Sequence, residues 1–264
     1  MLALKLAVQV AASAPEFVSK AVLITGAGAR LGAYLARGLA ADGWHVCIHY
    51  NRSASEANQL AGEITKSGGS VSTVQANLSA PDEVAGLIEK CGRELHALIN
   101  NASTFKPDTA QGFTTESWDY HRAVNLDAPL RLAANFAQQA PVGSCIINMI
   151  DQRVLKPNPQ FFTYSLAKAG LYWATKTLAQ SFAPHIRVNG VGPGPTLENS
   201  GQGEGEFEAE AQATLLGGGS PPDTILHAVR YLLEAKAVTG QMIAVDGGQH
   251  LVWQTPDLAF GGAV

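Results

Sequence analysis

Short apolar runs alternate with longer amphipathic stretches along most of this sequence. The runs are mostly continuous rather than alternating in polarity, which is typical of strands buried on both faces of a parallel sheet. We expect strands over residues 21–26, 45–50, 70–77, 97–101, 144–150, 186–190 and 241–245. Helices are expected between them, over residues 31–42, 53–66, 80–93, 115–139, 161–183 and 222–234. This order predicts an α/β fold: one Rossmann-type, doubly wound domain whose seven-stranded parallel sheet has helices on both faces.

No internal repeat or change of composition divides this pattern. We therefore expect one domain over residues 20–250, between an N-terminal extension (1–19) and a C-terminal tail (251–264). The stretch 195–222 departs from the alternation, because it is rich in Gly and Glu and too long for an ordinary connection. It is either a solvated loop without a task or a lid. Its place after a late strand, where ligands bind in open α/β sheets, favours a mobile substrate loop.

The composition narrows the class of protein. Hydrophobic residues make up 46% of the 264 positions, which suffices for a full core and argues against global disorder. The 22 acids outnumber the 18 bases, and no segment gathers Lys and Arg, so we expect neither nucleic acid nor an anionic membrane as a partner. No apolar run approaches the length that crosses a bilayer.

The cysteines and the N-terminus bear on the compartment. The three cysteines are an odd number without metal-like spacing, so we expect buried, reduced thiols in a cytoplasmic protein and no metal site. The first 15 residues faintly resemble a secretory signal peptide, with an apolar stretch and Ala-Ser-Ala before Pro15. Because Gln9 interrupts the apolar stretch and Lys5 is its one base, we interpret the segment as a loose extension.

The first expected strand runs into a glycine-rich turn, Thr25 to Gly32 (TGAGARLG), and a helix follows at once. Glycines in such a turn let the backbone approach a pyrophosphate, and the free N–H groups at the helix start favour its charge. A glycine pattern alone also fits a plain tight turn. Its place directly after the first strand predicts a nucleotide site.

The end of the second strand indicates which nucleotide binds. NAD-specific sheets place an acid here to hold the ribose 2′-hydroxyl, but no acid appears before Glu56. Arg52 instead presents a guanidinium suited to a 2′-phosphate, and Arg30 in the glycine turn adds a second cation. We therefore predict NADPH as the cofactor; the alternative is that Arg52 is a surface charge without a ligand.

Further motifs follow along the chain in a fixed order. They are Asn100-Asn101-Ala102, Asn125, Tyr164-Ser165-Leu166-Ala167-Lys168, Pro193-Gly194 and Val245-Asp246-Gly247-Gly248. With the glycine turn, and over about residues 20–250, this set resembles the short-chain dehydrogenase/reductase family. Tyr164 and Lys168 stand four apart on one helix face, where an ammonium is expected to lower the pKa of the phenol.

The resemblance implies a reaction and an assembly. Tyr164 would donate a proton as hydride arrives from the nicotinamide, Lys168 would also hold the nicotinamide ribose, and Asn125 would carry a water of the proton relay. The helices expected over 115–139 and 161–183 would pair subunits into a homotetramer.

Departures from the common family pattern refine the prediction. Arg30 stands at a usual glycine, Ser103 follows Asn-Asn-Ala where Gly is usual, and Asp151 replaces the Ser that polarises a carbonyl. With the stretch Asn-Ala-Ser-Thr-Phe that ends at Phe105, these departures resemble pteridine reductases. Asn77 replaces the usual Asp at the adenine, and its amide oxygen can still accept a hydrogen bond.

The physical logic agrees with a pterin, which is a flat heterocycle with several nitrogen donors and acceptors. Phe105 would stack on one face of the ring, Ser103 and Arg30 would bind its edge, and Asp151 would orient Tyr164. Phe105 as a loop anchor and Asp151 as a strand-end cap are the plainer alternatives.

Three functions are compatible with these motifs. The first is an NADPH-dependent reductase of dihydropterin or dihydrofolate-like substrates. The second is a carbonyl reductase of the same fold, acting on a 3-oxoacyl thioester, a quinone or a sugar, and the third is a nucleotide-sensing protein without turnover. The expected catalytic residues are Tyr164, Lys168, Asp151 and Asn125, and the expected substrate-binding residues are Arg30, Ser103, Phe105, Asp151 and Tyr164. The expected cofactor-binding residues are Gly26, Arg30, Leu31, Gly32, Tyr50, Asn51, Arg52, Ser53, Asn77, Leu78, Asn101, Ala102, Ser103, Tyr164, Lys168, Pro193 and Gly194.

Overall fold

A computed structural model describes residues 20–198 and 203–253. The expected N-terminal extension, most of the expected tail and residues 199–202 of the expected substrate loop lie outside the described residues. The described strands form one parallel sheet in the order β3-β2-β1-β4-β5-β6-β7, which confirms the predicted fold class. They are β1 (Ala21–Ile24), β2 (His45–Tyr50), β3 (Ser70–Gln75), β4 (Ala97–Asn100), β5 (Ser144–Met149), β6 (Ile186–Pro193) and β7 (Met242–Val245).

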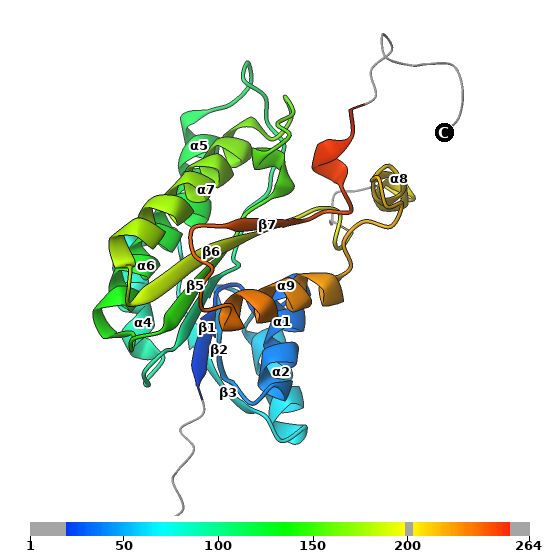
Figure 1. Ribbon diagram of the computed structural model, residues 1–264. Helices are drawn as coiled ribbons and strands as arrows, with labels where there is room; N and C mark the ends of the chain where they lie inside the picture. Colours follow the sequence, from blue (N-terminus) through cyan, green and yellow to red (C-terminus); the bar gives the residue numbers. More distant parts are fainter. Residues whose placement is uncertain (1–19, 199–202, 254–264) are drawn as a thin grey trace, which may run out of the picture.

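Helices cover both faces of this sheet. In the described residues they are α1 (Arg30–Ala41), α2 (Ala54–Lys66), α3 (Pro81–Ala85), α4 (Leu87–Lys90), α5 (Thr115–Arg122), α6 (Ala128–Gln139), α7 (Phe162–Phe182), α8 (Glu206–Gln212) and α9 (Pro222–Glu234). Figure 1 shows α1, α2 and α9 on one face and α4, α6 and α7 on the other. Alternate side chains of β1 enter two separate cores: Val22 and Ile24 pack toward the first group, Ala21 and Leu23 toward the second. Because β1, β4 and β5 are buried on both sides, their sequences are largely continuous apolar runs, whereas the edge strand β3 alternates in polarity and is partly exposed.

The order of the strands places the site. The strand β1 pairs with β2 on one side and with β4 on the other, so the chain reverses its direction of winding between β1 and β4. Ligands of open α/β sheets bind in the crevice at the carboxyl ends of strands beside such a switch point. The turns that follow β1, β4, β5 and β6 meet there.

Two of the predicted helices differ from their expected form. The helix expected over 80–93 is divided at Gly86 into α3 and α4, because glycine is a weak helix former. The helix expected over 115–139 contains a π turn, η1 (Ala123–Asp127), between α5 and α6. Pro129 has no N–H for the carbonyl four residues earlier, that of Asn125, and its ring would clash with that carbonyl. The wider turn accommodates this proline.

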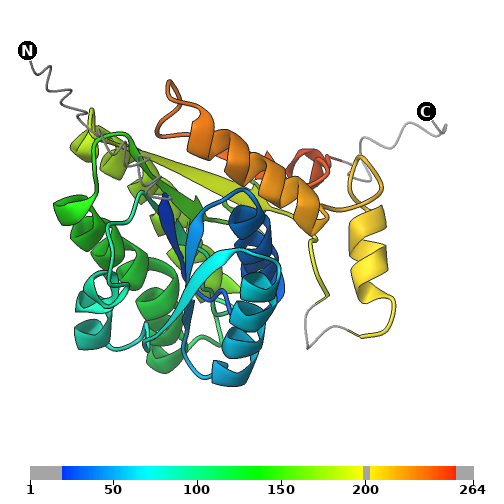
Figure 2. The same cartoon turned by 90° about the horizontal axis from the view of Figure 1, so that it is seen from below.

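The stretch expected as a loop over 195–222 holds a helix that the sequence did not predict. The helix α8 begins after Gly205, whose φ of 77° favours glycine. Figure 2 shows α8, in yellow, standing apart from the helices that cover the sheet. Two short 3₁₀ turns, η2 (Gln152–Val154) and η3 (Gln249–Leu251), were also not predicted.

Candidate active site

A continuous hollow runs along the carboxyl ends of the strands. One part, of about 360 Å³, lies between the β5 and β6 ends and α8. A second part, of about 410 Å³, lies over the glycine turn. Both are lined by Arg30, Leu31, Asn101 and Ser103, so the two parts join at the ends of β1 and β4.

The glycine turn is shaped by close backbone approaches. Gly26 has a φ of 63°, and a Cβ on it would lie 2.9 Å from the Cα of Ala102. A Cβ on Gly32 would lie 2.4 Å from the Gly26 carbonyl oxygen. Larger residues at these positions would therefore displace the turn.

A buried histidine to which the sequence analysis assigned no role holds this turn against the sheet. The Nδ1 of His49 accepts the N–H of Gly26 at 3.0 Å, and its Nε2 lies 3.0 Å from the Ala76 carbonyl oxygen. Burial lowers the pKa of His49 to about 4, outweighing the opposing hydrogen bond to Ala76. The ring is therefore neutral and has one donor and one acceptor, as these two bonds require.

The residues expected at the nucleotide's far end lie together. Arg52 and Ser53 line a hollow of about 830 Å³ with Tyr50, Asn51 and Asn77. The amide oxygen of Asn77, expected to accept a bond from adenine, accepts the N–H of Ser79 at 3.0 Å. Leu78 lines the adjoining part of the hollow over the glycine turn.

Asn101 and Ala102 fix the end of β4 to the end of β1. The backbone N–H groups of both residues donate to the hydroxyl of Thr25, at 2.9 and 3.0 Å. The side-chain amide of Asn101 donates to the Thr25 carbonyl at 2.9 Å. These bonds set the width of the crevice where the two parts of the hollow join.

The elongated hollow, its glycine turn and the N-terminus of α1 fit a dinucleotide.

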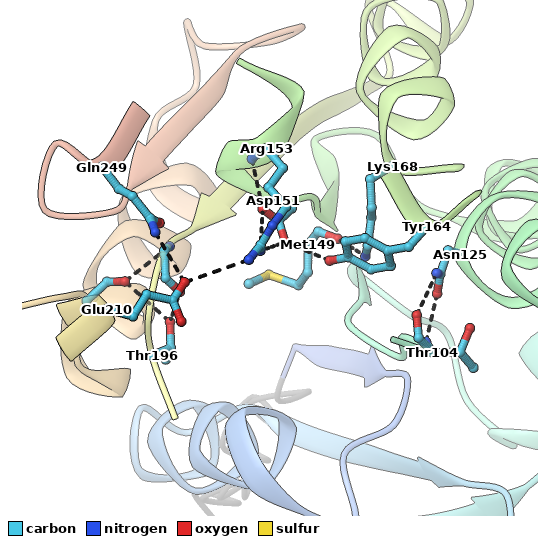
Figure 3. Close-up of polar contacts among 12 residues, drawn as sticks. Thr104, Asn125, Met149, Asp151, Arg153, Tyr164, Lys168, Thr196, Glu210 and Gln249 are labelled. Atoms are coloured by element: carbon cyan, nitrogen blue, oxygen red, sulfur yellow. Dashed lines mark hydrogen bonds and ion pairs between the residues drawn. The ribbon is translucent and has the colours of Figure 1, made fainter. Parts of the chain in front are cut away.

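Tyr164 lies near the start of α7 and lines the hollow, and Figure 3 shows its hydroxyl directed toward Asp151. Its hydroxyl donates to Oδ2 of Asp151 at 2.7 Å. Burial, and then the adjacent carboxylate of Asp151, raise the pKa of Tyr164 well above its ordinary value. The phenol therefore keeps its proton at neutral pH, which suits a proton donor.

Lys168 does not act on Tyr164 in the expected way. Its Nζ donates to the backbone carbonyl of Met149 at 2.8 Å. Burial lowers the pKa of Lys168 to about 8, against the opposing influence of Asp151. The expectation that this ammonium lowers the pKa of Tyr164 was wrong for the described structure, in which burial and Asp151 raise that pKa.

Asn125 lies in the π turn and holds the loop that follows β4. Its amide donates to the Thr104 carbonyl and accepts the Thr104 N–H, both at 2.9 Å. One turn earlier, Nε2 of His121 accepts the N–H of Lys106 at 3.2 Å. Both ends of the Asn125 amide are thus occupied by backbone, and its expected part in a proton relay stays a prediction.

Phe105 lies on this same loop and belongs to an aromatic cluster. It stacks on Phe161 with ring centroids 4.1 Å apart and meets Tyr164 edge-on at 4.8 Å. Phe161 was missed from the sequence. It precedes α7 in a left-handed conformation, with a φ of 57°, which is unusual for a residue with a large side chain.

Arg153 is another residue that was not predicted from the sequence. Its guanidinium reaches Asp151 at 3.2 Å and Glu210 of α8 at 3.7 Å. Figure 3 shows it lying between these two carboxylates. Its place two residues after Asp151 was the one signal that could have identified it.

Arg30 lies at the junction of the hollow, with a φ of 53°. Its guanidinium donates to the carbonyls of Glu198 at 2.7 Å and Leu197 at 3.2 Å. It therefore faces the expected substrate loop. Pro193 and Gly194 line the hollow at the end of β6, and a Cβ on Gly194 would lie 2.7 Å from the Cα of Asp246.

The described residues carry neither a metal cluster nor a membrane span. Across residues 20–198 and 203–253, no group of three or more His, Cys, Asp or Glu side chains is arranged to hold a metal ion. In the same ranges, no helix combines the length and apolar character needed to cross a bilayer. All three cysteines are buried and unbridged.

Comparison with known proteins finds a family model, related sequences and solved structures that match most of this chain. The family model described as short chain dehydrogenase matches residues 20–208. Pteridine reductase 1 of Leishmania tarentolae is 32% identical over 276 residues, covering 87% of this chain and 96% of the relative. A 3-oxoacyl acyl-carrier-protein reductase of Synechocystis is 30% identical, covering 87% and 96%. The crystal structure of FolM alternative dihydrofolate reductase 1 from Brucella canis, complexed with NADP, is 42% identical with a TM-score of 0.88, covering 91% of this chain and 97% of that one.

Proposed function

The chain belongs to the short chain dehydrogenase family, and we propose that it is an NADPH-dependent reductase of pterin rings, with dihydropterin or dihydrofolate-like substrates. The observation that carries the proposal is the hydrogen bond from Tyr164 to Asp151. A carbonyl reductase needs a hydroxyl donor beside the substrate oxygen, and an ionised carboxylate has no proton to donate.

The chemistry of a pterin accounts for this pair. Reduction of a ring C=N bond requires a hydride at carbon and a proton at nitrogen. Bound NADPH supplies the hydride. Tyr164 holds its proton at neutral pH, and its hydrogen bond to Asp151 fixes the position of the phenol oxygen. The O–H turns from Asp151 to the ring nitrogen to deliver that proton. We assign proton donation to Tyr164 and its orientation to Asp151.

The walls of the cavity suit a flat ring. Phe161 covers one face of Phe105, which leaves the other side of Phe105 for a substrate. Ser103 and Arg30 line the same cavity. Ser103 offers a hydroxyl to the ring edge, and the Arg30 guanidinium, which donates to the Leu197 and Glu198 carbonyls, would reach the edge by exchanging one of these bonds for the substrate. An aromatic wall and a few polar groups are typical of a site for a heterocycle.

Assignment of the cofactor rests on the far end of the hollow. Arg52 and Ser53 are the groups available there for a 2′-phosphate, and NADP is bound in the Brucella canis relative. We assign the pyrophosphate to the turn from Gly26 to Gly32 and the nicotinamide ribose to Lys168.

A carbonyl substrate is the second candidate. The observation in its favour is that the Synechocystis 3-oxoacyl reductase is nearly as similar in sequence as the pteridine reductase, at 30% against 32% identity. The replacement of the expected Ser by Asp151 counts against it.

One experiment separates the two candidates. NADPH oxidation is followed through the absorbance of the reduced nicotinamide, against dihydropterins, dihydrofolate, quinones and 3-oxoacyl thioesters. Turnover of a pterin substrate well above that of every carbonyl supports the proposal. Reduction of a quinone or oxoacyl thioester without any pterin turnover replaces it with the second candidate.

We also infer a homotetramer that works in the cytoplasm. The helix α7 exposes large apolar side chains: Trp173 is 66% exposed and Leu166 is 46% exposed. Apolar surface of this kind on a long helix suits a subunit contact. Three unbridged, buried cysteines suit a reducing compartment.

A further inference from the structure

Arg153 connects parts of the site that are distant along the chain. Its backbone N–H donates to Oδ1 of Asp151 at 2.8 Å, and its Nη1 lies 3.4 Å from that oxygen and 3.2 Å from Oδ2. Its Nη2 lies 3.7 Å from Oε1 of Glu210, the same oxygen that accepts the Gln249 side-chain amide at 3.2 Å. A polar chain therefore runs from Tyr164 through Asp151 and Arg153 to α8 (Figure 3).

The guanidinium also lies against the aromatic wall. Its central carbon is 5.5 Å from the ring centroid of Phe105 and equally far from that of Phe161. The Arg153 side chain is only 17% exposed, so these contacts are shielded from solvent. Its Nε is buried without an acceptor among the described residues. A buried donor of this kind needs an explanation.

The two ion pairs divide one guanidinium between two carboxylates. Nη1 forms an ion pair with Asp151, and Nη2 forms one with Glu210. A guanidinium that faces a single carboxylate prefers to bind it with both nitrogens. If α8 moves away, Glu210 leaves and the guanidinium has a defined second arrangement, bidentate on Asp151. Asp151 then accepts hydrogen bonds from both terminal nitrogens of Arg153, which changes its hydrogen bond with the Tyr164 hydroxyl.

We propose that Arg153 is a positioning residue that couples the seating of α8 to the alignment of the Asp151–Tyr164 pair. With α8 in place, Glu210 holds the guanidinium in its shared arrangement and Asp151 holds the Tyr164 hydroxyl. The inference rests on the proposed role of Tyr164 as proton donor. It adds to that role a means by which α8 governs proton delivery.

The charges around the pair define the expected pH effect. Arg153 faces it from η2, Lys168 from α7, Glu210 from α8 and Arg30 from the glycine turn. The positive charge of Arg153 lowers the pKa of Tyr164, in opposition to burial and Asp151. Removing that charge therefore moves the loss of the Tyr164 proton to higher pH.

The test uses four variants of the full chain: Arg153→Met, Arg153→Lys, Glu210→Gln and the double variant Arg153→Met/Glu210→Gln. Amide hydrogen exchange of residues 206–212 is measured with NADPH present and requires no substrate. We expect Arg153→Met and Glu210→Gln each to raise exchange about three- to tenfold, as for residues of one ion-pair network. The double variant should exchange no faster than either single variant. Additive effects, or unchanged exchange in Glu210→Gln, would overturn the coupling.

Kinetics supply the second readout, on whichever substrate the native enzyme reduces. Arg153→Met should lower kcat more than it changes KM, because it disturbs the alignment of the Asp151–Tyr164 pair and leaves the substrate contacts in place. Arg153→Lys should recover neither kcat nor the exchange protection, because it keeps the charge but lacks the fork. An unchanged kcat in Arg153→Met overturns the proposal. If no pterin is reduced, the proposed function fails, while the exchange data still decide the coupling.

Arg37→Met is the matched control. It breaks an exposed Arg–Glu ion pair between α1 and α2, with 2.7 Å between Arg37 Nη2 and Glu63 Oε2. It should leave the exchange of α8 and kcat unchanged. A similar change in this control would show that the effects of the Arg153 variants are not specific to the site, and would overturn the proposal.

Discussion

Replacing Asp151 by Ser tests the proposed chemistry most directly. The substitution removes the acceptor of the Tyr164 hydroxyl, now 2.7 Å away, and restores the residue that carbonyl reductases of this family are expected to use. A hydrogen bond to a charged group contributes about 1.5–3 kcal/mol. If that bond aligns the donor in the transition state, its loss lowers kcat on a pterin about 10- to 100-fold, since about 1.4 kcal/mol corresponds to a factor of ten.

The same variant should also change the pH dependence. After burial, the Asp151 carboxylate is the largest cause that raises the pKa of Tyr164. Without it, the pKa values of Tyr164 and of Lys168, which Asp151 also raises, both fall, so the alkaline limb of the kcat profile should move down. The shift of the Tyr164 pKa is opposite to that expected for Arg153→Met, because the two side chains carry opposite charges.

The assay is NADPH oxidation with a dihydropterin at saturating concentration, followed from acidic to alkaline pH. Asp151→Asn is measured beside it, because the amide keeps the shape and loses the charge. Thermal unfolding of each variant separates an effect on the reaction from an effect on folding. Unchanged pterin turnover and an unmoved alkaline limb in a folded Asp151→Ser enzyme would refute the reasoning.

Four further results are expected. Arg52→Asp should weaken NADPH binding at least tenfold, about 1.4 kcal/mol, with little change for NADH; fluorescence titration measures both, and equal affinity of the native protein for the two nucleotides would contradict it. Phe105→Ala should raise the dissociation constant of a pterin about two- to tenfold, because an aromatic stack contributes about 0.5–1.5 kcal/mol beyond its buried area; an unchanged constant by calorimetry would remove Phe105 from the substrate site. The pKa of Lys168 is about 8 in the folded protein and 10.5 in the unfolded chain. Between these values the unfolded chain binds more protons at Lys168 than the folded protein does, so the free energy of unfolding rises with pH in this window. Urea unfolding at the two ends of that window should show the gain in the native protein and not in Lys168→Met; an equal gain in both would contradict it. Light scattering should give about four times the 27.7 kDa chain mass, and a mass of one chain at micromolar concentration would exclude the tetramer.

The sequence predicted the sheet because buried parallel strands are continuous apolar runs, and it predicted the glycine turn because Gly26 and Gly32 have no room for a side chain. The spacing of four residues also predicted that Tyr164 and Lys168 share one helix face. The partner of Lys168 could not be predicted, because the acceptor is the backbone carbonyl of Met149, and every residue has one. The sequence therefore identified the side chains and misjudged their electrostatics.

Other features had no signal of sufficient strength. The left-handed backbone of Phe161 is fixed by its surroundings, since a phenylalanine does not favour it. The helix α8 was missed because glycines are frequent on both sides of it, although Glu206–Gln212 contains none and consists largely of good helix formers. Arg153 is a common residue type, and its role depends on Glu210, which lies 57 residues later, as their numbers show.

The π turn between α5 and α6 has a consequence for the whole helical stretch. One extra residue in a turn rotates everything after it by about 100°, since an α-helix has 3.6 residues per turn. Before the turn, His121 faces the loop after β4; beyond it, Leu132 and Phe136 lie in the core below the sheet. The π turn therefore rotates the helix surface, so that the residues before it contact the loop after β4 and the residues after it pack in the core. Deleting one residue from Ala123–Asp127 would remove the wider turn while Pro129 stays, so it would rotate Leu132 and Phe136 out of the core and press the proline ring against the preceding turn, at a cost to folding far greater than that of a shorter helix.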